Sequence, residues 1–250
     1  MNLRNTKKYK TVFLGKNGYI YGCIKEYFNN DCFIFTDIEN LKKIINDNNN
    51  ITTLFFLYGP NRSQCQNNFN NSYRRYTKYL NQVFNIVKTK NIWIYKLSTI
   101  HAVNNEVSNY AKFYNKVDAI FLNKYQKSSI IYLGNIFGVL SKNNKFEDIN
   151  FIHKYMFSYI QNKKLIIDNL NSMRNYTPIY YLFRKIKNII LTNNHSSRRI
   201  VVKKKLISNR AIVNLIAKKN ENVYFSKEFI YTINNLEKIY LNDIVINPSI

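Results

Sequence analysis

The chain has 250 residues, of which 46% are hydrophobic, with only 6 Gly and 3 Pro. A chain of this length and composition buries a sizeable core, which excludes a disordered or linker-rich protein. No apolar run approaches the ~20 residues needed to cross a bilayer, and none follows the basic N-terminus as a signal peptide requires. We therefore expect a cytoplasmic protein.

The cysteines and histidines form no metal-binding pattern. The three histidines are scattered along the chain, and the thiols at Cys23, Cys32 and Cys65 lack the spacing of metal ligands. An odd number of cysteines also cannot pair completely in disulfides. We expect buried thiols in a reducing compartment and no metal site.

The net charge of +24 has two interpretations. The sequence is rich in Asn, Lys, Ile, Tyr and Phe, so that many lysines belong to a biased composition and a solvated surface. Such an excess is also typical of proteins that bind nucleic acids or anionic membranes. Basic residues gather locally at 7–10, 74–78 and 198–205, without the spacing of a known nucleic-acid module.

Apolar, β-rich runs alternate with helical patterns in the first 140 residues. Strands are predicted at 11–14, 32–36, 53–58, 91–97 and 129–134. Helices are predicted between them at 19–29, 38–46, 71–88 and 108–123. Beyond residue 140 the pattern predicts helices and short strands in turn, at 147–161, 164–167, 178–191, 199–202 and 208–219. Strand–helix alternation favours a parallel sheet with right-handed crossovers, covered by helices on both faces.

A glycine turn follows the first strand. Val12 to Leu14 lead into Gly15 and Gly18, and an amphipathic helix comes next. In this order of elements the turn lets a diphosphate approach the backbone, and the helix N-terminus supplies free N–H groups. Two glycines in a Gly-x-x-Gly pattern also occur in ordinary turns, so the pattern alone does not decide between these readings.

Several segments, in order, resemble the extended short-chain dehydrogenases/reductases, which include nucleotide-sugar epimerases and dehydratases. The similar segments are the glycine turn at 15–22, Asp37 after the second strand, Leu54 to Gly59, Ile92 to His101, the helix that Tyr110 opens, Ile131 to Gly138, and Asn171 to Ile179. Together they span about residues 10–220. The resemblance implies a Rossmann-type fold, NAD or NADP as cofactor, and a nucleotide-activated sugar as substrate.

The resemblance also implies roles for single residues. The catalytic pair would be Thr99 and Tyr110. The cofactor would contact Gly15, Gly18, Tyr19, Ile20, Asp37, Gly59 and Arg62. The substrate would contact Asn135 and Arg174, the latter through its diphosphate. Asp37 has a second explanation, because Asp is also a favoured N-cap for the helix predicted after it.

Two positions depart from the family's pattern. A phenol with a pKa near 10 is a poor base at neutral pH, and the family places a lysine one helical turn after the tyrosine to stabilise the phenolate. Here Tyr114 occupies that position, while Lys112 and Lys116 point to other faces of the helix. Tyr21 stands where the third glycine of the turn would fall.

We thus predict an α/β protein with a Rossmann-type, doubly wound parallel sheet at 1–140. A smaller mixed α/β region at 141–250, interleaved with the first, would bind the substrate. Three functions fit: a divergent NAD(P)-dependent epimerase, dehydratase or reductase acting on a nucleotide sugar; a catalytically degenerate relative kept for binding a ligand or partner; and a basic nucleic-acid-binding protein. The resemblance further implies a homodimer through the helices at 71–88 and 108–123.

Overall fold

A computed structural model describes most of the chain in side-chain detail. The described residues are 10–16, 18–28, 32–104, 107–138, 152, 169–192, 195, 198–202 and 205–219. The helix predicted at 147–161 and the strand predicted at 164–167 lie outside this part, apart from residue 152.

Six parallel strands form the main sheet. Their bounds are β1 Thr11–Leu14, β2 Phe33–Thr36, β3 Thr53–Phe56, β4 Trp93–Thr99, β5 Ser128–Leu133 and β8 Arg199–Val201. They lie in the order β2-β1-β3-β4-β5-β8, so the chain reverses its direction of winding between β1 and β3. In register, Val12 of β1 lies between Ile34 of β2 and Leu54 of β3.

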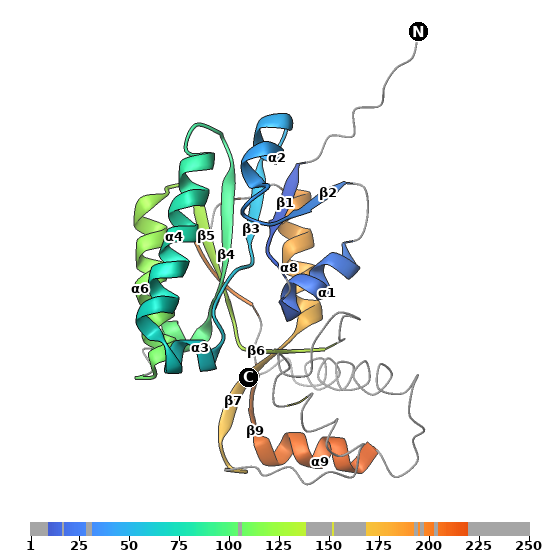
Figure 1. Cartoon of the computed structure of the whole chain (residues 1–250). Coiled ribbons are helices and arrows are strands. Elements are labelled where there is room, and N and C mark those ends of the chain that lie inside the picture. The colour runs from blue at the N-terminus through green and yellow to red at the C-terminus, as the bar shows by residue number, and fades with distance from the viewer. Residues whose placement is uncertain are drawn as a thin grey trace.

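Helices cover both faces of this sheet, as Figure 1 shows. One face packs against α2 Leu41–Asp47, α3 Arg62–Asn67, α4 Phe69–Val87, α5 Ile100–Val103 and α6 Asn109–Lys124. The other face packs against α1 Tyr19–Tyr27 and α8 Ile179–Thr192. The apolar stripe of α4 recurs at helical spacing through Tyr76, Leu80, Val83 and Val87, all buried, and this periodicity fixes which side of the helix faces the sheet.

A smaller sheet of mixed direction lies beyond the carboxyl ends of the parallel strands (Figure 1). It consists of β6 Asn135–Phe137, β7 Met173–Pro178 and β9 Lys205–Ser208, and α9 Asn209–Lys219 follows β9. Strand β6 runs parallel to β7, and β9 runs antiparallel to it. Gly134 makes the junction between β5 and β6 possible, because a Cβ there would lie 2.7 Å from the Asn175 carbonyl oxygen.

The predicted fold class is confirmed: a doubly wound parallel sheet of Rossmann type with a smaller mixed sheet. The chain between β2 and β3 forms a single helix, α2. The sheet order begins 2-1-3-4-5, which is one of the two common orders of doubly wound sheets. Strand β8, from beyond residue 140, extends the sheet that the first 140 residues begin. The boundary between 1–140 and 141–250 stays a prediction.

Candidate functional site

The carboxyl ends of β1 and β3 mark the point where the winding of the sheet reverses. In doubly wound sheets, ligands bind in the crevice outside the strand ends at this position. The glycine turn follows β1 here, and Tyr58, Gly59 and Pro60 follow β3. The sequence-predicted cofactor residues therefore come from the loops at this edge and from the first turns of α1 and α3.

The turn after β1 leaves one glycine open and covers the other. Gly18 is the N-cap of α1, with an extended backbone and no side-chain cap, and a Cβ at this position would meet nothing within 4 Å among the described residues. The backbone at the start of α1 is thus accessible to an anion. The side chains of Tyr19 and Ile20 pack against the core and are partly buried, and their backbone forms the start of α1.

Tyr21 lies over Gly15, the first glycine of the turn. A Cβ built at Gly15 would lie 2.5 Å from the Tyr21 ring, which means that the ring rests against the glycine backbone. The same ring packs edge-on against Phe35 of β2, with 6.0 Å between the centroids. Burial, and then the charge of Asp37, raise the pKa of the Tyr21 phenol. The side chain that replaces the third glycine therefore fills space beside the turn.

A cavity of about 750 Å³ opens beside these residues, which is within the ordinary range for small-molecule sites. Asp37 and Gly59 contribute to its lining from the ends of β2 and β3, and Lys16 and Arg75 contribute positive charge. The Asp37 carboxylate accepts hydrogen bonds from Asn40 N and Nδ2, at 3.1 and 3.0 Å. The backbone bond is the main cause that lowers the Asp37 pKa. Asp37 thus stabilises the turn before α2 and also lines the cavity.

The predicted catalytic residues lie together at the end of β4. Thr99 is the last residue of β4 and caps α5, since its Oγ1 accepts from His101 N at 3.4 Å. Tyr110 is held near the start of α6, where Ser108 Oγ accepts from Ala111 N at 3.2 Å. Burial raises the Tyr110 pKa to about 12, against the opposing effect of hydrogen bonding to Thr99 and Tyr114. The phenol is therefore protonated at neutral pH.

Arg62 is the cation that the fold brings to Tyr110. A capping box between Asn61 and Gln64, with bonds of 2.8 and 2.9 Å, fixes the start of α3 and so the position of Arg62. The guanidinium carbon lies 5.8 Å from the centroid of the Tyr110 ring, and its charge works to lower the phenol's pKa. Arg62 is not among the residues that line the cavity around Asp37.

Tyr114 occupies the interior at the position of the family's lysine. Its hydroxyl donates to Pro60 O at 3.1 Å, and a Cβ at Gly59 would overlap that hydroxyl. The absence of a side chain at Gly59 is thus explained by this internal contact. Lys112 and Lys116 of the same helix are exposed, as their spacing predicts.

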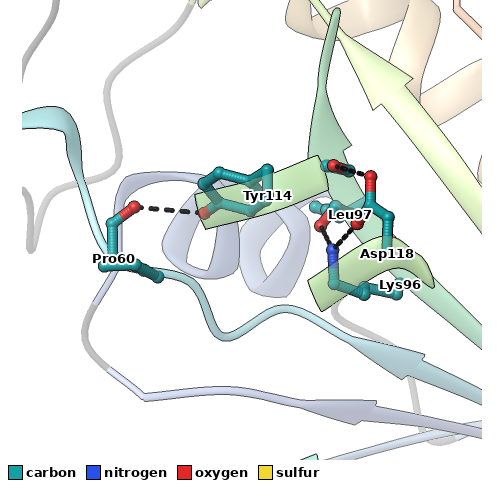
Figure 2. A network of polar contacts seen from close by, with 6 residues as sticks. Pro60, Lys96, Leu97, Tyr114 and Asp118 are labelled. Atoms are coloured by element: carbon teal, nitrogen blue, oxygen red, sulfur yellow. Dashed lines mark hydrogen bonds and ion pairs between the residues drawn. The ribbon is translucent and has the colours of Figure 1, made fainter. Parts of the chain in front are cut away.

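A buried ionic network lies under this site, and the sequence reading did not identify it (Figure 2). Lys96 Nζ meets Asp118 Oδ1 at 2.5 Å and Leu97 O at 3.3 Å, while Ser98 Oγ donates to Asp118 Oδ2 at 2.7 Å. Burial lowers the Lys96 pKa, and Asp118 opposes this shift. The Lys96 ammonium also lies 5.0 Å from the Tyr114 ring centroid, so the network supports the tyrosine that replaces the lysine.

The predicted substrate residues lie in the smaller sheet. Asn135 is in β6, and its amide donates to Asn175 O of β7 at 3.0 Å. Arg174 is in β7, where it pairs with Ile207 of β9. Both residues are half-buried. The small sheet thus brings the two to neighbouring strands beyond the carboxyl edge of the main sheet.

The histidines differ in their surroundings. The ring of His195 stacks on Trp93 with 4.8 Å between centroids, and its Nδ1 lies 2.8 Å from the Tyr95 hydroxyl, which is a packing arrangement. His101 lies 6.2 Å from the Tyr110 ring, and His153 lies outside the described residues. Within the described ranges no three His, Cys, Asp or Glu side chains are grouped to hold a metal ion. No helix in that part is long and apolar enough to cross a membrane.

The outer faces of α4 and α6 do not carry an apolar dimer surface. None of the large hydrophobic side chains exposed in the described residues lies on either helix. The exposed positions there include Arg74, Arg75, Lys78, Lys112 and Lys116. Pairing two such faces would oppose like charges. The homodimer stays a prediction.

Comparison with known proteins gives a likeness of fold. No protein-family model matches the sequence, and neither does any curated protein. Among solved structures, UDP-glucuronic acid 4-epimerase from Bacillus cereus, in complex with UDP-glucuronic acid and NAD, is similar over 86% of this chain and 84% of its own, at 14% identity and a TM-score of 0.67.

Two further structures are similar. A dTDP-4-dehydrorhamnose reductase from Clostridium acetobutylicum matches 84% of this chain and 79% of its own, at 14% identity and a TM-score of 0.65. The capsular polysaccharide assembling protein CapF from Staphylococcus aureus matches 84% of this chain at 15% identity and a TM-score of 0.61, and the chain covers 57% of CapF. The resemblance expected from the sequence is thus confirmed in the fold, which this chain shares with nucleotide-sugar epimerases and reductases.

Proposed function

We propose that the chain is an NAD(P)-dependent oxidoreductase that reduces a carbonyl group of a nucleotide-activated sugar. The single observation that carries this proposal is the pair Thr99 and Tyr110, joined at the end of β4 beside the edge where the sheet reverses its winding. The similar solved structures support the proposal, since one is a nucleotide-sugar reductase and another is an epimerase with NAD bound.

The residues at the strand ends fit a dinucleotide. The accessible backbone at Gly18 and the start of α1 would hold the diphosphate, and Asp37 in the cavity would accept hydrogen bonds from a ribose. When bound, a reduced nicotinamide supplies a hydride to carbon. This contact needs only backbone at Gly18, whereas the Tyr21 ring that rests on Gly15 is the departure from the family's pattern that bears on the approach to the turn.

A protonated Tyr110 fits the role of general acid in a reduction. Burial raises the pKa of this phenol to about 12, so it holds its proton at neutral pH and can donate it to the substrate oxygen. Thr99 would hold the same oxygen by a hydrogen bond. As the proton leaves, the Arg62 guanidinium stabilises the developing phenolate, a task that falls to lysine in the family.

The substrate would extend toward the smaller sheet. Arg174 offers a positive charge to a diphosphate, and Asn135 lies on the neighbouring strand. A nucleotide sugar has both a sugar carbonyl to be reduced and a diphosphate to be held. In Figure 1, β7 lies beyond the carboxyl end of β4.

A second candidate is a binding protein without turnover. The observation that favours it is Tyr21, whose ring rests on Gly15 and narrows the approach to the turn. Under this hypothesis the chain binds a nucleotide or sugar ligand, and the phenol of Tyr110 has no chemical role.

Turnover of reduced cofactor with nucleotide-linked keto sugars tests the two candidates. We expect Tyr110→Phe to lower kcat by at least about 100-fold, because general acid catalysis contributes that much, while the unfolding midpoint falls by only about 2–4 °C for the lost hydroxyl hydrogen bonds. Tyr125→Phe is the matched control, since Tyr125 donates to Ile92 O at 2.8 Å, away from the site. Equal turnover in the wild type and in Tyr110→Phe would refute the catalytic role; cofactor binding with no turnover of any such sugar would favour the second candidate.

A further inference from the structure

A groove of about 670 Å³ runs along α8, away from the cofactor cavity, and the two share no lining residue. Half of the large hydrophobic side chains exposed in the described residues gather in it: Tyr27, Tyr180, Leu191 and Val201, exposed by 46, 37, 73 and 53%. A soluble protein rarely concentrates exposed apolar surface in one place unless that surface binds something.

The groove also carries positive charge alone. Arg184, Lys185 and Lys187 line it, and none of its described lining residues is acidic. Arg184 and Lys187 stand three residues apart and are neighbours on the surface of α8, and like charges at this spacing destabilise a helix. Their arrangement is complementary to a ligand that brings several negative charges.

The aromatic rings in the groove are held in place. Tyr27 of α1 stacks on Phe183 of α8 with 4.2 Å between centroids and an interplanar angle of 21°. One face of Tyr27 is therefore occupied by the protein, while nearly half of the residue remains exposed. The guanidinium carbon of Arg184 lies 5.8 Å from the centroid of the Tyr180 ring, so a cation and an exposed ring lie side by side in the groove. Tyr27 is thus a platform on which a second flat group can stack at little cost in side-chain entropy, and Tyr180 offers a second exposed ring.

We propose that this groove binds single-stranded nucleic acid, with the phosphates held by the α8 cations and the bases stacked on Tyr27 and Tyr180. Single strands combine regularly spaced negative charge with exposed aromatic faces, and proteins that bind them combine basic grooves with aromatic platforms. A duplex hides its base faces in the stack, so the tyrosines would contribute nothing to its binding. A membrane surface is flat and lacks aromatic faces, whereas this site is concave.

The inference goes beyond the proposed oxidoreductase and does not depend on it. The net charge of +24 alone would give diffuse attraction over the whole surface. The groove predicts instead that binding depends on a few residues of α1 and α8, which makes the two explanations distinguishable.

The test measures binding of a labelled oligothymidylate of about 12 nucleotides to the full chain, over a range of salt concentrations. The groove variant is Arg184→Gln/Lys185→Gln/Lys187→Gln. The control, Lys42→Gln/Lys43→Gln/Lys88→Gln, removes the same charge from exposed lysines of α2 and the end of α4, on the other layer of the fold. We expect the groove variant to bind at least about tenfold more weakly and to lose about 2 from the salt slope, and the control to change both much less.

A second pair of variants tests the stacking. Tyr180→Leu and Tyr27→Leu keep apolar bulk but remove the ring, and each should weaken oligothymidylate binding by about tenfold while leaving heparin binding unchanged, since heparin has no bases. Tyr180 is the safer site because Tyr27 also packs on Phe183. Three results overturn the proposal: no binding at low salt, equal losses in the groove and control variants, or tyrosine variants that bind oligothymidylate like the wild type. Tighter binding to anionic vesicles, insensitive to Tyr180→Leu, would also overturn it.

Discussion

Replacing Asp118 by Asn leaves the Lys96 ammonium buried without its counter-ion. Lys96 is fully buried and Asp118 is 5% exposed, so water screens neither charge. The amide preserves the shape of the side chain and one acceptor oxygen, and what is lost is the charge. Removing one partner of a buried pair costs about 3–5 kcal/mol. Because a domain is stable by only about 5–15 kcal/mol, this loss is a large fraction of the total.

The assay is urea unfolding at neutral pH, with Asp47→Asn as the control on the exposed end of α2. We expect Asp118→Asn to lose about 3 kcal/mol and Asp47→Asn to change by less than about 0.5 kcal/mol. The double variant Lys96→Met/Asp118→Leu removes both charges and should recover most of the loss, since apolar replacement of a buried pair is often neutral or stabilising. Equal, small effects of Asp118→Asn and Asp47→Asn would refute the account of this network.

The free energy of unfolding of the Asp118→Asn variant should depend on pH, and the Lys96 pKa gives the direction of that dependence. Burial lowers the Lys96 pKa below its ordinary 10.5, and Asp118 is what opposes this. Without Asp118 the folded variant releases the lysine proton at a lower pH, while the unfolded chain keeps it up to its ordinary pKa. Stability therefore rises with pH in that window, by up to about 1.4 kcal/mol per pH unit. The deficit relative to the wild type should therefore shrink as the pH rises toward the ordinary pKa of lysine.

Three further changes have defined outcomes. Gly59→Ala places a Cβ on the Tyr114 hydroxyl and should lower the free energy of unfolding in urea by about 1–3 kcal/mol. The same substitution should cost far less in a Tyr114→Phe background, which lacks that hydroxyl. Equal costs in both backgrounds would contradict the contact. Tyr21→Gly removes the ring from Gly15 and should tighten cofactor binding, measured by calorimetry, by about tenfold. The control Lys25→Gly weakens the same helix by about 1 kcal/mol and should not tighten binding. Looser binding in Tyr21→Gly would show that the ring holds the ligand. Arg62→Met should lower turnover by between about two- and tenfold, and Arg62→Lys should give a turnover between those of the wild type and Arg62→Met. The control Arg74→Met, on the outer face of α4, should leave turnover unchanged. Turnover unaffected by Arg62→Met would remove Arg62 from the site.

The elements of the main sheet were predictable because their signals are local. Strand β3 is a run of apolar residues between polar loops, and α4 shows helical spacing in Tyr76, Leu80, Val83 and Val87. Both signals depend on neighbours in sequence. The predicted bounds of the six strands of the main sheet and of the six helices α1, α2, α4, α6, α8 and α9 accordingly agree with the structure to within a few residues.

The individual strands of the smaller mixed region and two short helices were missed for a physical reason. Strand β7 contains Arg174, Asn175 and Thr177, a polar run that becomes a strand only through pairing with distant β6 and β9. Helix α3 is short, and its signal was the capping box at Asn61 and Gln64, which a search for apolar periodicity passes over.

The candidate site was predicted in part. The positions of Thr99 and Tyr110 follow from the end of one strand and the start of one helix, and their meeting required only parallel topology. The Lys96–Asp118 pair could not be assigned, because a lysine in a strand reads as polar unless its partner is known. The available signal was that Lys96 lies on the same face of β4 as the buried Ile94 and Ser98, and that Asp118 lies next to the buried Val117 on α6.

Titration of NAD(H) and NADP(H) against the thermal unfolding midpoint tests the central claim, in the wild type and in Gly18→Val. A cofactor at about 100 times its Kd stabilises the folded state by about 2.7 kcal/mol, which raises the midpoint by about 5–10 °C for a chain of this length. Because a Cβ at Gly18 meets nothing within 4 Å, we expect Gly18→Val to fold like the wild type yet to lose this shift. No shift of the wild type with any of the four compounds, or an equal shift in both proteins, would contradict a cofactor site at the glycine turn.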